Sequence, residues 1–129
     1  MRNDSNVAEG LRLANMDLDT AQYVFGNMYP KPCEIICYHC QQATETFLKA
    51  LALANDQEPL RTHNLVVLAK SLGGCVQIPL SILRMCAMLN PYGVKVRYLQ
   101  DMAVGIQDAR AALEYSQEIK KCPDALIGV

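Results

Sequence analysis

The side chains that could do chemistry gather in one stretch of the chain, residues 33–54. This stretch carries Cys33, Cys37, His39 and Cys40, residue types that suit a zinc site or a redox pair. Zinc sites usually combine a short-spaced ligand pair on a turn with a second pair from elsewhere, but these residues share one predicted helix. Reactive cysteine pairs use a helix N-terminus to stabilise the thiolate, and Cys37 and Cys40 lie in mid-helix. We therefore expect buried thiols, no metal and no cofactor.

Polar residues line one flank of the same stretch, namely Gln41, Gln42, Glu45 and Lys49. Glu45 precedes Lys49 by four residues, which is the favourable order for an ion pair on a helix. A flank of this kind is typical of a solvated face or of the rim of a dimer interface. His39, at the edge of the apolar arc, is either a buried, hydrogen-bonded core residue or a contact to a ligand or partner. The part of this flank where we first expect a ligand or a dimer contact consists of His39, Gln42, Thr46 and Lys49.

Three further candidate residues lie outside this stretch. His63 follows Thr62, a predicted N-cap, so its partner is either the local backbone or a ligand. Arg97 and Tyr98, with Lys95 close by, could form a small patch that binds an anion or stacks on a base. The chain has no glycine-rich phosphate loop, no HExxH motif and no Gly-x-Ser-x-Gly motif.

The elements that must position these residues are predicted to be helices. Apolar residues recur at helical spacing, and Pro or Gly separates the runs, so we expect a five-helix, all-α, up-and-down bundle. The predicted helices span about 7–28, 33–54, 63–72, 79–89 and 104–121. Residues 33–54 carry the widest apolar arc and should form the central helix. In the last helix, the residues expected inside are Ile106, Ala109, Leu113, Ser116 and Ile119.

The rest of the chain is assigned to tails and a loop. Residues 1–6 are expected to be a disordered tail, residues 7–122 a single helical domain, and residues 123–129 a loose tail because Pro123 should block the helix. Residues 94–103 alternate like a short strand, but one strand without a partner is unstable. We therefore expect an ordered loop there.

Composition supports helices and excludes some functions. Hydrophobic residues make up 51% of the chain and aromatics 6%, with no Trp, whereas strands prefer β-branched and aromatic residues. The net charge of −1 provides no global basic field to hold nucleic acid. The first residues have no apolar signal core, and no apolar run is long enough for a membrane span. We expect a cytoplasmic protein with reduced thiols.

Several motifs, in a consistent order, resemble a known family. Ala14-Asn15-Met16-Asp17-Leu18 precedes a Tyr29-Pro30 link and then the run Ile36-Cys37-Tyr38-His39-Cys40-Gln41-Gln42-Ala43. Thr62-His63-Asn64-Leu65 follows, and the last helix contains Asp108-Ala109. Over roughly residues 8–121 the chain resembles the HEPN domain (higher eukaryotes and prokaryotes nucleotide-binding).

The resemblance implies a HEPN-like helical bundle, commonly a homodimer. It also implies a nucleotide or RNA ligand, or a small nucleotidyltransferase partner, in a toxin–antitoxin-like or stress and defence system. Many such proteins are metal-independent ribonucleases whose site is an arginine and a histidine separated by four to six residues. Neither His39 nor His63 has such an arginine, and the residue that follows Arg84 at this spacing is Asn90, which cannot act as a general base. We expect a binding module, with a ribonuclease that uses His39 or His63 with Arg97 as the alternative.

Overall fold

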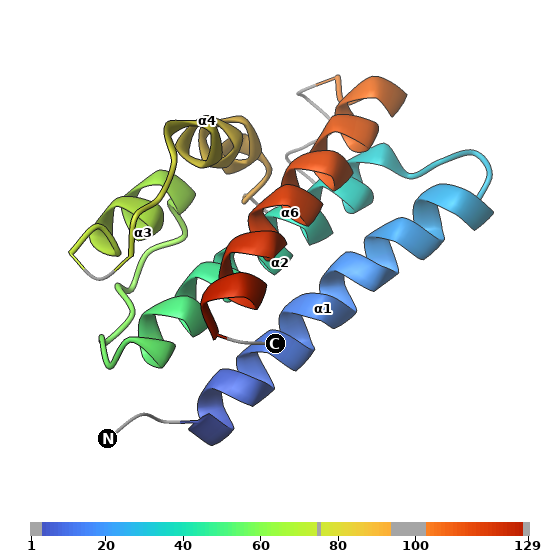
Figure 1. The fold of residues 1–129 in the computed structure, drawn as a ribbon. Helices are drawn as coiled ribbons and strands as arrows, with labels where there is room; N and C mark the ends of the chain where they lie inside the picture. Colours follow the sequence, from blue (N-terminus) through green and yellow to red (C-terminus); the bar gives the residue numbers. More distant parts are fainter. Residues whose placement is uncertain (1–3, 75, 94–102, 128–129) are drawn as a thin grey trace.

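The protein is an all-α bundle in a computed structural model that describes residues 4–74, 76–93 and 103–127. Within these residues five α-helices and one 3₁₀ helix form, and no strand (Figure 1). They are α1 (Asp4–Asn27), α2 (Cys33–Ala54), α3 (Leu65–Ser71), α4 (Leu80–Leu89), η1 (Asn90–Gly93) and α6 (Ile106–Ile127). The predicted fold class is confirmed.

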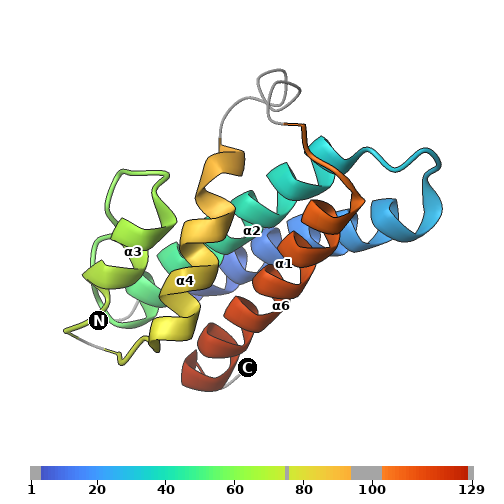
Figure 2. The same cartoon turned by 90° about the horizontal axis from the view of Figure 1, so that it is seen from above.

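Helix α2 is the centre of the bundle, as its apolar arc predicts. It packs on α1 and α6 and also touches α3, α4 and η1. The chain runs up α1 and back along α2, and α6 lies alongside both (Figure 1). Seen from above, α4 lies between α3 and α6 (Figure 2). Helix α2 therefore contacts each of the other described helices.

A buried apolar arc and a buried polar contact account for the packing of α2. Its apolar arc, which includes Ile36, Ala43, Phe47 and Leu51, is buried, and burial of apolar area from water stabilises the bundle. The buried hydroxyl of Thr44 donates to the carbonyl of Cys40 at 2.9 Å and lies 3.1 Å from the Ser116 hydroxyl of α6. These contacts satisfy the polar groups that the α2–α6 interface removes from water.

The thiols of α2 belong to this core, as expected. Cys33, Cys37 and Cys40 are buried. Desolvation raises the pKa of Cys37 to about 12, and the negative charge of Asp108 adds to the shift. Desolvation also raises the pKa of Cys33 and Cys40. Thiols in this environment stay protonated and are poor nucleophiles.

The structure corrects both predicted tails. Helix α1 begins at Asp4, so residues 4–6 are not a tail. Their polar side chains suit the first turn of a helix as well as they suit a tail. Helix α6 runs past Pro123 to Ile127. Proline lacks one hydrogen-bond donor, but its fixed φ lies within the helical range, so the helix can continue beyond it.

Two local predictions were also wrong. The third helix begins at Leu65 rather than His63, and Asn64 rather than Thr62 is its N-cap, because the Asn64 side chain accepts hydrogen bonds from the helix. Ile106 is exposed because it opens α6, whose burial starts at Ala109. The other four residues predicted inside the last helix are buried.

The loop predicted for residues 94–103 lies outside the described residues, apart from Ala103. Arg97 and Tyr98, two of the candidate site residues, fall in that stretch. None of the described helices is both long and apolar enough to cross a membrane.

Candidate functional site

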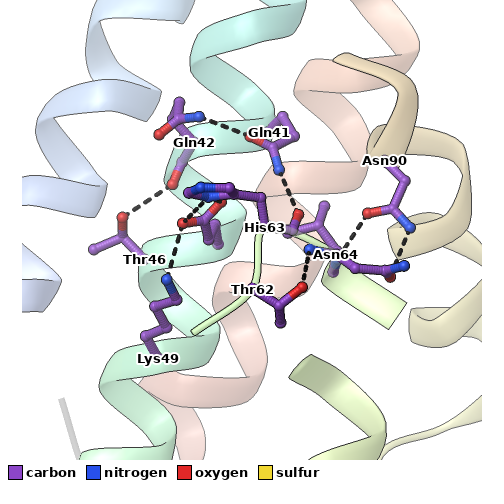
Figure 3. Close-up of polar contacts among 10 residues, drawn as sticks. Gln41, Gln42, Thr46, Lys49, Thr62, His63, Asn64 and Asn90 are labelled. Atoms are coloured by element: carbon purple, nitrogen blue, oxygen red, sulfur yellow. Dashed lines mark hydrogen bonds and ion pairs between the residues drawn. The ribbon is translucent and has the colours of Figure 1, made fainter. Parts of the chain in front are cut away.

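A nearly buried carboxylate joins α2 to the loop that precedes α3. The Glu45 side chain is 9% exposed. Its Oε2 atom accepts a hydrogen bond from Lys49 Nζ at 3.1 Å, and its two oxygens lie 3.0 and 3.1 Å from Nδ1 of His63 (Figure 3). A buried charge is stable only when it is paired and hydrogen-bonded. Glu45 therefore holds both Lys49 and His63 in place.

The contact with Glu45 determines which nitrogen of His63 can meet a ligand. A carboxylate only accepts hydrogen bonds, so Nδ1 of His63 carries the proton in this contact. In the neutral ring, Nε2 then keeps its lone pair and can accept a hydrogen bond or a proton. The His63 side chain is 77% exposed. The ring is thus oriented on one side and open to solvent on the other.

Gln41 supports this loop from the interior, which the sequence did not indicate. It was expected on the polar flank, but it is fully buried. Its Nε2 atom donates to the carbonyl of His63 at 3.1 Å, and its Oε1 atom accepts from Gln42 Nε2 at 3.0 Å. Gly93 of η1 covers it so closely that a Cβ there would lie 2.9 Å from Gln41 Nε2. Helical periodicity correctly places Gln41 on the polar side of α2. That side is not exposed at Gln41, because η1 covers it.

Two asparagines fix the start of α3 beside His63. Asn64 Oδ1 accepts from the backbone N–H of Val66 and Val67 at 3.0 and 3.1 Å. Asn90 Oδ1 accepts from Leu65 N at 2.7 Å, and Asn90 Nδ2 donates to Asn64 Oδ1 at 2.9 Å. This arrangement joins η1 to α3 (Figure 3). The sequence showed Asn90 only as an unsuitable base, because nothing in its spacing reveals a partner 26 residues away.

These residues border an open hollow on the surface. It has a volume of about 460 Å³ and is lined by His63, Asn64, Asn90, Pro91 and Gly93. Small-molecule sites usually have volumes of a few hundred Å³ and a few fixed polar groups. We call the hollow together with Glu45, Lys49 and Gln41 the His63 site.

The remaining residues of the predicted flank do not join the His63 site in the same way. His39 Nδ1 lies 3.0 Å from Asp17 Oδ1, so this half-buried histidine links α2 to α1. Gln42 reaches the site only through Gln41. The hydroxyl of Thr46 donates to the carbonyl of Gln42 within α2. The structure thus separates the two histidines into different environments.

No metal site emerges from the described part of the chain. Within those residues, no group of three His, Cys, Asp or Glu side chains could hold a metal ion. The chemistry available at the His63 site is hydrogen bonding, ring stacking and proton exchange at an imidazole.

Comparison with known proteins identifies the family. The model of the HEPN domain matches residues 7–124, so the chain belongs to the HEPN domain family. A search of curated proteins returned no match.

Two crystal structures share the fold. One is TT1696 from Thermus thermophilus, with 25% identity and a TM-score of 0.80 over 92% of this chain and 96% of that chain. The other is ST0689, described as an archaeal HEPN homologue, with 22% identity and a TM-score of 0.76 over 94% of this chain and 97% of that chain.

Proposed function

We propose that this HEPN-domain protein is a non-enzymatic binding module that takes a nucleotide at the His63 site. The observation that carries the proposal is the exposed His63 ring, which Glu45 orients at the edge of an open hollow. The nucleotide-binding role implied by the family resemblance points to the same class of ligand. The net charge of −1 favours a small ligand over a long nucleic acid, which needs an extended basic surface.

The side chains of the site suit the parts of a nucleotide. The His63 ring offers a face on which a base can stack and, at Nε2, a hydrogen-bonding atom for the base edge or the sugar. Lys49, which shares Glu45 with His63, is partly exposed and supplies a positive charge nearby. Asn64 and Asn90 add fixed amide groups to the lining of the hollow.

A titration with mononucleotides tests the proposal. We expect ATP or GTP to bind the full chain in calorimetry, and His63→Ala to weaken binding about tenfold, as the loss of one base-stacking contact implies. His39→Gln is the matched control, because His39 contacts Asp17 instead of the hollow. Equal affinity of wild type and His63→Ala, or the absence of any nucleotide binding, would exclude this role.

One observation favours a second function, a metal-independent ribonuclease. A carboxylate that orients an imidazole is the arrangement of a general base, and Glu45 and His63 form such a pair. The missing family motif argues against it, because Asn90 stands after Arg84 where a histidine would be expected, and an amide cannot act as a general base. Cleavage of RNA in EDTA by wild type but not by His63→Ala would establish the ribonuclease, and intact RNA would exclude it.

We also propose that the protein acts as a homodimer in the cytoplasm, with a small nucleotidyltransferase as a partner in a toxin–antitoxin-like or stress and defence system. The support is the family resemblance together with buried thiols that suit a reducing compartment. A nucleotidyltransferase encoded in the adjacent reading frame, and its co-purification with this chain, would support the pairing. Light scattering at high concentration tests the dimer, because a monomer throughout would contradict it.

A further inference from the structure

A second cavity lies between α3, α4 and the segment that joins them, and we call it the α3–α4 cavity. It has a volume of about 280 Å³. Helices α3 and α4 pack on each other, and the chain passes from one to the other at an edge of the molecule (Figure 2). No residue lines both this cavity and the hollow beside His63. The α3–α4 cavity is therefore separate from the His63 site.

Apolar side chains form walls of the cavity. Val76, Ile78 and Leu83 line it, and each is only partly buried although it packs on the hydrophobic core. A backbone hydrogen bond from Val76 N to the carbonyl of Leu72 at 2.9 Å fixes the segment that follows α3. A dry apolar cavity of about 150 Å³ is enough to hold a benzene ring, so these walls leave room for a hydrocarbon group.

The chain around the cavity is basic and offers hydrogen-bond donors. Residues 59–100 contain five Lys and Arg residues and no Asp or Glu, although the whole chain has 13 acidic residues. Lys70 lines the cavity and is exposed, and among the described residues no ion pair involves it. Its flexible stem can carry the ammonium group towards a bound ligand. Exposed Gln77 also lines the cavity and can donate from its amide.

We infer that the α3–α4 cavity binds a small carboxylic acid with a hydrocarbon tail. The carboxylate only accepts hydrogen bonds, so it is complementary to Lys70 and Gln77. The tail lies against Val76, Ile78 and Leu83 and is removed from water there. A sugar or a phosphate would bring polar groups against apolar walls that cannot satisfy them. The ligand class therefore differs from the nucleotide proposed for the His63 site, and neither proposal depends on the other.

Matched compounds test the class of ligand. We expect hexanoate to bind the full chain in an NMR titration at neutral pH, where its carboxylate is ionised, and to shift the backbone amide signals of Val76 and Leu83. Hexanol has a similar tail without the charge, and acetate has the charge without the tail, so both should bind more weakly. Affinity should rise about fourfold with each methylene group from butyrate to hexanoate, as the burial of one such group implies. Absence of hexanoate binding, or equal affinity for hexanoate and either hexanol or acetate, would contradict the inference.

Removal of the Lys70 charge tests how the acid is held. Lys70→Gln should weaken the binding of hexanoate about two- to fivefold, the range for an exposed ion pair, and leave the binding of hexanol unchanged. Arg84→Gln is the matched control, because Arg84 is an exposed cation of the same basic stretch but does not line the cavity. Equal affinity of wild type and Lys70→Gln for hexanoate would overturn the inference. An equal loss in Arg84→Gln would also overturn it, because the acid would then respond to the basic stretch as a whole.

His63→Ala separates the two sites. This variant should bind hexanoate as wild type does, because His63 lines the hollow and not the α3–α4 cavity. Loss of hexanoate binding in His63→Ala would place the acid in the hollow and refute the assignment to the α3–α4 cavity. Normal hexanoate binding by a wild type that binds no nucleotide would support this inference and refute the nucleotide proposal alone.

Discussion

At the scale of single residues, the contact between Gln41 and Gly93 is the tightest constraint on the site. Gln41 is fully buried and fixes the carbonyl of His63, so its position determines where the His63 backbone lies. Gly93 permits this only because it has no Cβ. Buried amides that lose a partner destabilise a protein strongly.

We predict that Gly93→Ala lowers the free energy of unfolding by about 1–3 kcal/mol, the usual cost of an extra methyl group in a packed site. The new Cβ would lie 2.9 Å from Nε2 and 3.0 Å from Cδ of Gln41, a side chain with no exposed area into which to move. Urea unfolding measures the change. Gly26→Ala serves as the control, because a Cβ added at Gly26 would meet no described atom within 4 Å beyond its chain neighbours and the backbone of its own helix. Wild-type stability of Gly93→Ala would mean that Gln41 has another position available.

At the scale of elements, the short helix α3 depends on side chains from outside itself. Asn64 caps it from the preceding loop, and Asn90 of η1 accepts the backbone N–H of Leu65. Seven residues are too few for a helix to be stable alone. The position of the start of α3, next to His63 in the chain, therefore depends on η1.

We predict that Asn90→Ala destabilises the start of α3 by about 1–2 kcal/mol, the usual range for the loss of a helix cap. Hydrogen exchange should accelerate at Leu65 and over the first turn of α3. Asn27→Ala is the matched control, because its side chain donates to the Tyr23 carbonyl of its own exposed helix end. Unchanged exchange at Leu65 in Asn90→Ala would show that α3 is held by other contacts.

Helical periodicity predicted the elements well and the site only in part. It gave α2 its observed bounds and the buried face of its cysteines, because spacing along a helix determines which residues share a face. It could not show that η1 covers Gln41 or that Glu45 meets His63, since these contacts join residues that are far apart in sequence. The effect of Pro123 as a terminator was overestimated, because the cost of a proline is local.

At the scale of the whole molecule, the buried thiols make the stability of the fold sensitive to alkali. Burial raises the pKa of Cys37 to about 12, from an ordinary value of 9.0. It raises the pKa of Cys40 as well. Above pH 9 the unfolded chain releases these protons and the folded protein keeps them. The folded state then binds more protons, so its stability falls as pH rises.

We predict that, between about pH 9 and pH 12, wild type loses about 1.4 kcal/mol of stability per pH unit through Cys37, with a further loss through Cys40. Cys37→Ala should be less stable at neutral pH but should show a shallower decline between about pH 9 and pH 11. Urea unfolding at several pH values gives both slopes, and their difference removes the contribution of lysines and tyrosines common to both proteins. Identical slopes would contradict the effect of burial on Cys37.

Glu45 pairs with both Lys49 and His63, and this affects the energy that is needed to move the loop before α3. If His63 swings away from α2, Glu45 still holds Lys49, so the buried carboxylate is not left without a counter-charge. Opening then breaks the contact of the exposed imidazole and leaves the buried Gln41 amide without its His63 partner, which costs about 1–3 kcal/mol. Lys49 thus removes one penalty of opening, an unpaired buried carboxylate, and the cost that remains falls mainly on the buried Gln41 amide.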